Sequence, residues 1–144
     1  MKPFRNLCIL SVSLLLAIAC ENSEERSIRH NAQGYLDAMG AYEIDSAYSY
    51  ATKETQEITL PVAKKLTAIT DSNYIRRNTP ATTEILSIKQ INDSVAVVKF
   101  HKKTPIASFD GQLEMHKENG QWLAHVVLAQ MDQPSDSISD TTNR

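Results

Sequence analysis

Residues 28–39 carry apolar and polar side chains at the spacing of an amphipathic helix. Five apolar side chains fall on one stripe at positions i, i+4, i+7, i+8 and i+11: Ile28, Ala32, Tyr35, Leu36 and Met39. Ser27 precedes the stripe as a candidate N-cap, and Gly40 follows it as a candidate end. The pattern therefore predicts a helix over residues 28–39.

Two shorter helices are predicted next. One begins at Asp45 or Ser46, either of which can serve as its N-cap, and includes Ala51. The other has apolar residues at helical spacing, namely Ile58, Val62, Leu66 and Ile69. Pro61 either opens this helix near its first turn or kinks it.

From residue 82 onward the pattern favours β-strands. Residues 85–91 and 95–103 are rich in branched side chains and are separated by the turn formers Asn92 and Asp93. Residues 112–117 and 121–131 flank Asn119-Gly120, the preferred pair for a two-residue type I′ turn. Two antiparallel hairpins are therefore predicted.

The second turn fixes which strand residues face one another. With Asn119 and Gly120 at its centre, Lys117 lies opposite Trp122, and Glu114 opposite His125. One face of the hairpin then carries Leu113, Met115, Trp122, Ala124, Val126 and Leu128, and the preceding strand supplies Ala96, Val98 and Phe100. Because this face must be covered, we predict an α+β fold in which N-terminal helices pack on a curved antiparallel sheet of about four strands.

The first residues have the features of an export signal. Lys2 and Arg5 precede an uncharged apolar run over residues 6–19. A bilayer span needs about 20 apolar residues, so this run suits a signal peptide better than a transmembrane helix. The run ends in Ala17-Ile18-Ala19-Cys20, followed at once by polar residues.

This ending resembles the lipobox of bacterial lipoproteins. The resemblance implies that residues 1–19 are removed, that Cys20 is acylated, and that the protein is held by lipid in the cell envelope, at the outer membrane, on its periplasmic side or at the cell surface. The alternative is an ordinary cleaved secretion signal with an incidental cysteine. After processing, Cys8 is lost and Cys20 is capped, so no disulfide is expected.

Length and charge define the remaining organisation. The chain has 144 residues and a formal net charge of -2, which allows one domain and argues against a nucleic-acid partner. Polar residues 20–26 read as a tether, residues 27–131 as the folded domain, and residues 132–144 as a disordered polar tail.

Two short motifs carry a resemblance to a known superfamily: Asp93-Ser94-Val95-Ala96-Val97-Val98 and Lys117-Glu118-Asn119-Gly120-Gln121-Trp122. The order of elements resembles the nuclear-transport-factor-2-like (NTF2-like), or cystatin-like, α+β cone superfamily, and is similar to small bacterial lipoprotein families of unknown function. The resemblance implies a space between sheet and helices that serves as a ligand pocket or active site, and dimerisation through the sheet.

No metalloprotease, phosphate-loop or nucleophile-elbow motif is present, so no cofactor is predicted and any enzyme would have to use the cone pocket. Tyr35, Asp37, Tyr48 and Trp122 are the pocket candidates, with Asp37 as general base in an isomerase-like or hydratase-like reaction. The simpler interpretation is that the two tyrosines pack in the core and that Asp37 faces solvent.

A second set of candidates comes from the strand register. Glu114, His116 and His125 share the outward face, and His101 lies on the strand before them. Imidazoles and a carboxylate on neighbouring strands could hold zinc, although such cross-strand pairs are also ordinary surface contacts.

The function predicted from these features is that of a membrane-anchored envelope protein with a non-catalytic domain that binds a ligand or another protein. The half-apolar outer face, which carries Leu123 and Val127, would suit an envelope partner or a second copy of the chain. An enzyme using the cone pocket, and an inhibitor or immunity-like lipoprotein, are the alternatives.

Overall fold

The structure is a computed structural model that describes the backbone of residues 7–128 and the side chains of residues 23–128. The helices are α1 (Leu7–Gly40), α2 (Ile44–Ala47), α3 (Leu60–Ile69) and α4 (Ser72–Asn78), with a 3-10 turn, η1 (Tyr48–Tyr50), and a π-helical turn, η2 (Thr55–Thr59). The strands are β1 (Thr82–Gln90), β2 (Val95–Lys103), β3 (Ser108–Glu118) and β4 (Gln121–His125). The predicted tail over residues 132–144 lies outside the described residues.

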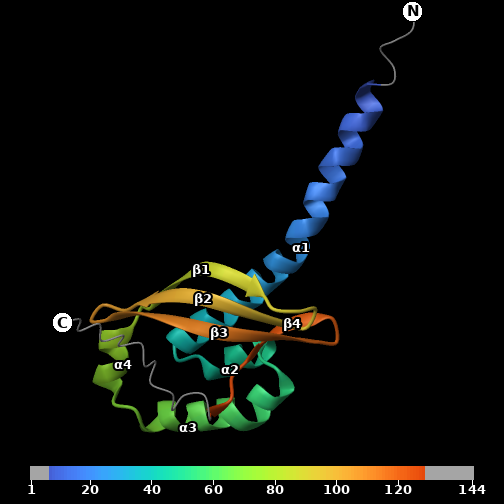
Figure 1. The fold of residues 1–144 in the computed structure, drawn as a ribbon. Helices are drawn as coiled ribbons and strands as arrows, with labels where there is room; N and C mark the ends of the chain where they lie inside the picture. The colour runs from blue at the N-terminus through green and yellow to red at the C-terminus, as the bar shows by residue number, and fades with distance from the viewer. Residues whose placement is uncertain (1–6, 129–144) are drawn as a thin grey trace, which may run out of the picture.

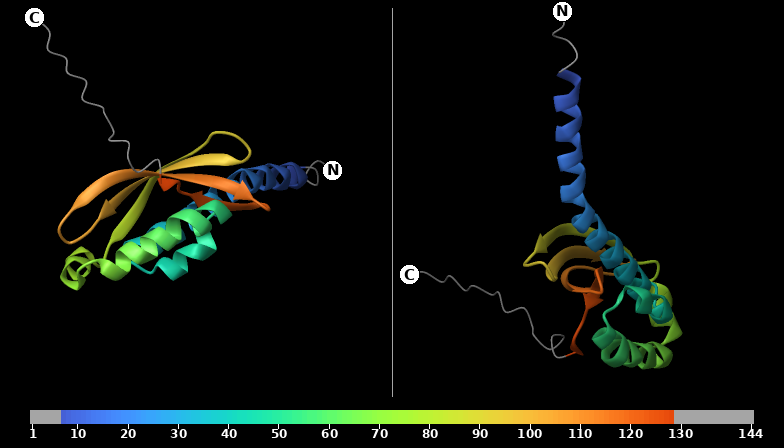
Figure 2. Two further views of the ribbon diagram at one scale, coloured as in Figure 1. Left: turned by 90° about the horizontal axis from the view of Figure 1, so that it is seen from below. Right: turned by 90° about the vertical axis from the view of Figure 1, so that its right-hand side faces the viewer.

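The four strands form one antiparallel sheet in the order β1-β2-β3-β4. The sheet is curved, and α1 passes along its inner side, with α2 and α3 on that same side (Figures 1 and 2). The first part of α1, drawn in blue, projects away from the rest of the molecule (Figure 1). The predicted α+β class is thus confirmed.

The hairpin between β3 and β4 has the predicted turn and register. Asn119 and Gly120 both have positive φ, 50° and 78°, as a type I′ turn requires. Lys117 pairs with Trp122 and Glu114 with His125, as predicted. The register is confirmed because the turn sets the pairing of every residue that follows.

β4 is shorter than the predicted strand, since it ends at His125. Its continuation is held by threonines of η2 instead of by β3. The Val126 amide donates to Thr55 Oγ1 at 2.9 Å, and Thr59 Oγ1 donates to the Val126 carbonyl at 2.5 Å. The predicted pairing of Leu113 with Val126 is therefore not part of the ladder.

The core lies between the inner face of the sheet and α1. The sheet buries Ala96, Val98, Phe100, Leu113, Met115, Trp122 and Ala124, and α1 buries Ile28, Ala32, Tyr35, Leu36 and Ala38. Val126 of the predicted inner set is half-buried and packs against this cluster. Ala32, with an exposed fraction of 0%, lets α1 approach the sheet closely.

The helix boundaries differ from those predicted. α1 does not begin at Ser27, which is an interior residue of one continuous helix, although it does end at Gly40 as predicted. Within the described residues, no helix is both long enough and apolar enough to cross a membrane. α2 begins at Ile44, with Glu43 in the N-cap position, rather than at Asp45 or Ser46.

The third helix, α3, does not include Ile58, the first residue of the predicted stripe, and it presents a different face to the core. Pro61 stands in its first turn, as one of the two alternatives expected, and the π-helical turn η2 precedes it. The predicted stripe is exposed, with Leu66 at 56% and Ile69 at 81%, whereas Leu60 is completely buried. α4 was not predicted; Asp71 caps it by accepting hydrogen bonds from the amides of Asn73 and Tyr74.

Glu24, in the segment predicted as a tether, is helical and contacts the sheet. Its carboxylate accepts hydrogen bonds from Lys117 Nζ and Trp122 Nε1, the first at 2.7 Å. The hydrogen bond from Lys117 is the largest of the causes that hold the pKa of Glu24 below its usual value, and the bond from Trp122 is the next. α1 is thereby attached to the β3–β4 hairpin.

This contact predicts a pH-dependent effect of Glu24→Gln. A carboxylate whose pKa is lowered by folding stabilises the folded state above its unfolded pKa, and the stabilisation is lost as the pH falls through the folded pKa. The variant should therefore melt at a lower temperature than wild type at pH 7, and the gap should close as the pH falls below about 4. Thermal melts across this pH range measure it.

Glu25→Gln is the matched control, because the partner of Glu25 among the described side chains is the exposed Arg29, one helical turn away. Exposed ion pairs of this kind contribute little to the stability of the folded state. A melting temperature lowered equally by both variants, or a gap that persists at low pH, would contradict a specific role for Glu24.

Candidate functional site

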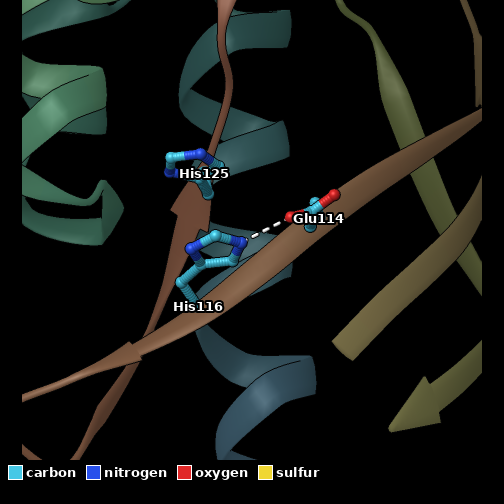
Figure 3. Close-up of side chains that lie close together, drawn as sticks. All are labelled: Glu114, His116 and His125. Carbon is cyan, nitrogen blue, oxygen red and sulfur yellow. Dashed lines mark hydrogen bonds and ion pairs between the residues drawn. The ribbon is translucent and has the colours of Figure 1, made fainter. Parts of the chain in front are cut away.

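The candidate site lies on the outer face of the sheet, where β3 and β4 carry two histidines and a glutamate. Glu114 and His116 are two residues apart on β3 and thus share a face, and His125 of β4 lies opposite Glu114. Figure 3 shows the three side chains together. One nitrogen from each imidazole and one carboxylate oxygen all lie within 4.8 Å of one another.

The two imidazoles are stacked. Their ring centres are 3.9 Å apart and their planes are inclined by 10°. His116 Nε2 and a Glu114 carboxylate oxygen form a hydrogen bond (Figure 3). The exposed fractions of the Glu114, His116 and His125 side chains are 33%, 30% and 13%, so the cluster is partly covered yet open to solvent.

A segment from between η1 and η2 covers His125 from the side. The amide of Thr52 donates to the carbonyl of Ala124 at 2.9 Å, and this bond places residues 51–54 along the edge of β4. Thr52 Oγ1 lies 3.2 Å from His125 Nδ1, and a Glu54 carboxylate oxygen lies 4.0 Å from His125 Nε2. His125 therefore has a polar neighbour at each ring nitrogen.

The hydroxyl of Thr52 is fully buried and fixed by further bonds. It accepts from the Thr55 amide at 3.3 Å and shares a hydrogen bond of 2.9 Å with Thr55 Oγ1. Thr52 Oγ1 could accept a hydrogen bond from the Nδ1–H of His125, which would leave Nε2, the nitrogen beside Glu54, with an unshared electron pair. Sequence reasoning missed Thr52 and Glu54, because nothing local connects residue 52 with residue 125.

The structure does not bring His101 into this cluster. His101 Nδ1 pairs with a carboxylate oxygen of Asp110 at 2.6 Å, at the other end of β2 and β3. The neighbour of His116 on β2 is Val95, six residues before His101, and six residues of strand span about 20 Å. The ligand-bearing set is therefore Glu114, His116 and His125, with Glu54 close by.

The four pocket candidates have different surroundings. Tyr35 and Trp122 are core residues with exposed fractions of 4% and 1%, and Tyr48 is half-buried. Burial raises the pKa of the Tyr35 phenol to about 12. Asp37 is exposed on α1 and accepts a hydrogen bond from Gln33 Nε2 at 2.8 Å.

A surface cavity of about 460 Å³ lies between α2 and α3. Tyr42, Asp45, Lys64 and Thr67 are among its lining residues. Lys64 Nζ and an Asp45 carboxylate oxygen form an ion pair of 2.6 Å, which raises the pKa of Lys64. This cavity lies outside the cone and shares no residue with the histidine cluster.

Comparison with solved structures shows an NTF2-like fold. A Campylobacter jejuni protein provisionally assigned as an NTF2-like transpeptidase has a TM-score of 0.51 at 14% identity, covering 67% of this chain and 94% of that one. An NTF2-like protein of unknown function from Shewanella oneidensis has a TM-score of 0.51 at 16% identity, covering 71% of this chain and 97% of that one. No family model matches the chain, and no curated protein is similar to it at a significant level.

Proposed function

We propose that this chain is a lipid-anchored protein of the bacterial cell envelope whose NTF2-like domain binds a ligand and does not catalyse a reaction in its cone. The filled interior carries the second part of this proposal. The inner face of the sheet is covered by α1, and Val98, Met115 and Trp122 are at most 1% exposed. A general acid or base must lie within hydrogen-bond reach of its substrate, whereas these described inner-face side chains are packed in the hydrophobic core.

We therefore propose that the ligand binds on the outer face of the sheet. The cluster of Glu114, His116 and His125 is the place where several groups with unshared electron pairs converge and remain open to solvent. The acid–base candidate of the enzyme alternative, Asp37, is exposed on α1, and its side chain accepts a hydrogen bond from Gln33 Nε2.

The anchor is supported by the sequence at the end of the apolar run. Small residues precede Cys20, and polar residues follow it directly. Stable anchoring requires more than one acyl chain, which a diacylglyceryl thioether together with an acylated amino terminus would supply. Cys20 would then stand four residues before Glu24, which contacts Lys117 and Trp122.

The anchor is tested by comparing Cys20→Ala with Cys8→Ala. Both variants remove one thiol from the same segment, but only Cys20 follows the small residues of the lipobox. In a bacterial host that makes lipoproteins, we expect wild type and Cys8→Ala to incorporate a labelled fatty acid and to sediment with membranes. Cys20→Ala should lose essentially all of the label.

Mass spectrometry of the mature amino terminus is the second measurement. The expected terminal residue is Cys20 with acyl chains on its sulfur and its amine. An unmodified Cys20, cleavage at another bond, or a label that persists in Cys20→Ala would overturn the anchor while leaving the binding role to be judged separately.

A further inference from the structure

We propose that Glu114, His116 and His125 form a binding site for a divalent transition-metal ion, with zinc as the best probe. The metal site rests on the proposed binding function and specifies the class of ligand. Two imidazole nitrogens and one carboxylate oxygen form a donor set that favours such ions. Mg²⁺ and Ca²⁺ are hard cations and prefer oxygen ligands alone.

The distances fit a site that closes by small side-chain movements. The three donor atoms already lie within 4.8 Å of one another. Zinc bonded at about 2.1 Å to each ligand keeps neighbouring donors roughly 3.4 Å apart, so the longest donor separation must shorten by up to about 1.4 Å, while the hydrogen-bonded His116–Glu114 pair must open. The Glu114 side chain is one-third exposed and can supply that movement, while the strands stay in place.

The backbone makes this convergence a fixed property of the fold. Glu114 and His116 occupy one face of β3, and the Asn119-Gly120 turn places His125 opposite Glu114. Three donors from two hydrogen-bonded strands need no loop rearrangement to meet. Such preorganisation reduces the entropy lost on binding.

The buried hydroxyl of Thr52 is a second, independent observation that favours a metal. Metal-bound histidines commonly donate a hydrogen bond from the N–H of their second ring nitrogen to an oxygen acceptor, which fixes the ring and its tautomer. Thr52 Oγ1 is 3.2 Å from His125 Nδ1, and its own position is fixed by bonds to Thr55. His125 Nε2 is then the nitrogen available to the ion.

Glu54 is available as a further oxygen ligand. One of its carboxylate oxygens lies 4.0 Å from His125 Nε2, on a side chain that is 53% exposed. Without an ion, the two imidazole rings stack and His116 forms a hydrogen bond with Glu114. Metal binding replaces that hydrogen bond, because His116 Nε2 must carry a lone pair to act as a ligand.

The test is zinc titration of the full chain, purified without an affinity tag in detergent and with both Cys8 and Cys20 replaced by alanine. The double replacement removes every thiol, so the result does not depend on whether Cys20 is acylated. We expect one zinc ion per chain with a dissociation constant of micromolar order or tighter, unaffected by millimolar Mg²⁺ or Ca²⁺.

Variants locate the site. In the same background, His116→Ala, His125→Ala and Glu114→Gln should each weaken zinc binding by about 100-fold, the size of effect that loss of a metal contact or its support produces. His101→Ala is the matched control, since it removes a histidine of the same sheet that pairs with Asp110 outside the cluster. Its zinc affinity should equal that of the parent.

Two substitutions of Thr52 test whether its hydroxyl positions His125 or whether the side chain only packs. Thr52→Val should weaken zinc binding by about 10-fold or more, while Thr52→Ser should restore it, because serine keeps the hydroxyl.

Zinc should raise the melting temperature of the parent and of His101→Ala but not of His125→Ala, as expected for a ligand that binds only the folded state.

Two results would overturn the metal site. One is no zinc binding at concentrations up to about 100 μM, a range in which a three-ligand site of this kind should be occupied. The other is binding that survives His116→Ala, His125→Ala and Glu114→Gln in folded protein, with folding verified by circular dichroism. Neither result would affect the lipid label, so failure of the metal site and failure of the anchor are distinguishable.

Discussion

Replacement of Trp122 by alanine is expected to remove about 3–5 kcal/mol from the free energy of unfolding, the range measured for large aromatic residues in protein cores. Trp122 is 1% exposed on the inner face of β4. Its Nε1 donates to Glu24, and its carbonyl accepts from Asn31 Nδ2 at 2.7 Å. The variant loses packed volume and a contact with α1 at the same position, whereas the carbonyl contact is kept.

Domains of this size are stabilised by only about 5–15 kcal/mol, so Trp122→Ala should leave the chain close to unfolding at 37 °C. Trp122→Phe is the matched control. It keeps an aromatic ring but loses the bond to Glu24, and should cost clearly less. Chemical denaturation followed by circular dichroism measures both, and a cost below about 1 kcal/mol for Trp122→Ala would contradict the burial seen in the structure.

The second large effect is expected at Leu60, the first residue of α3. Leu60 is completely buried, whereas Leu66 on the same helix is 56% exposed. Leu60→Ala should destabilise the domain by about 2–5 kcal/mol, since it removes a core side chain and leaves a cavity. Leu66→Ala should change stability by no more than about 0.5 kcal/mol.

The two substitutions are chemically identical and lie on one helix, so their difference isolates burial. Denaturant midpoints of the two variants and of wild type give the comparison. If Leu66→Ala proved the more costly of the two, α3 would have to dock on the core through the stripe of Ile58, Val62, Leu66 and Ile69, and its orientation in the structure would be wrong.

The same helix shows where sequence patterns stop being informative. All four residues of the predicted stripe are exposed, because helical spacing carries no information on whether another element covers the apolar side chains. The residue that anchors α3 is Leu60, at a junction with the π-helical turn η2, which no periodicity of 3.6 residues predicts. α4 could have been predicted from Asp71, a strong N-cap residue followed by helix-compatible side chains.

The β3–β4 hairpin illustrates the opposite case. Two adjacent residues that accept positive φ fix the turn, and the turn alone fixes the pairing of Glu114 with His125. Half of the candidate site was therefore predictable from local sequence. The other half was not, because Thr52 and Glu54 reach His125 only through the packing of a distant segment along the edge of β4.

The contact of Glu24 with the hairpin would also determine how the domain behaves above a bilayer. A domain that is anchored through a long flexible linker samples many orientations. In a chain acylated at Cys20, only residues 21–23 separate the lipid from a residue bound to Lys117 and Trp122. With so short a connecting segment, the domain would rotate little relative to the membrane, and the histidine cluster would keep one orientation relative to the membrane plane. Partners diffusing within the bilayer would then meet it at a fixed height, a geometric selection that binding chemistry alone could not provide.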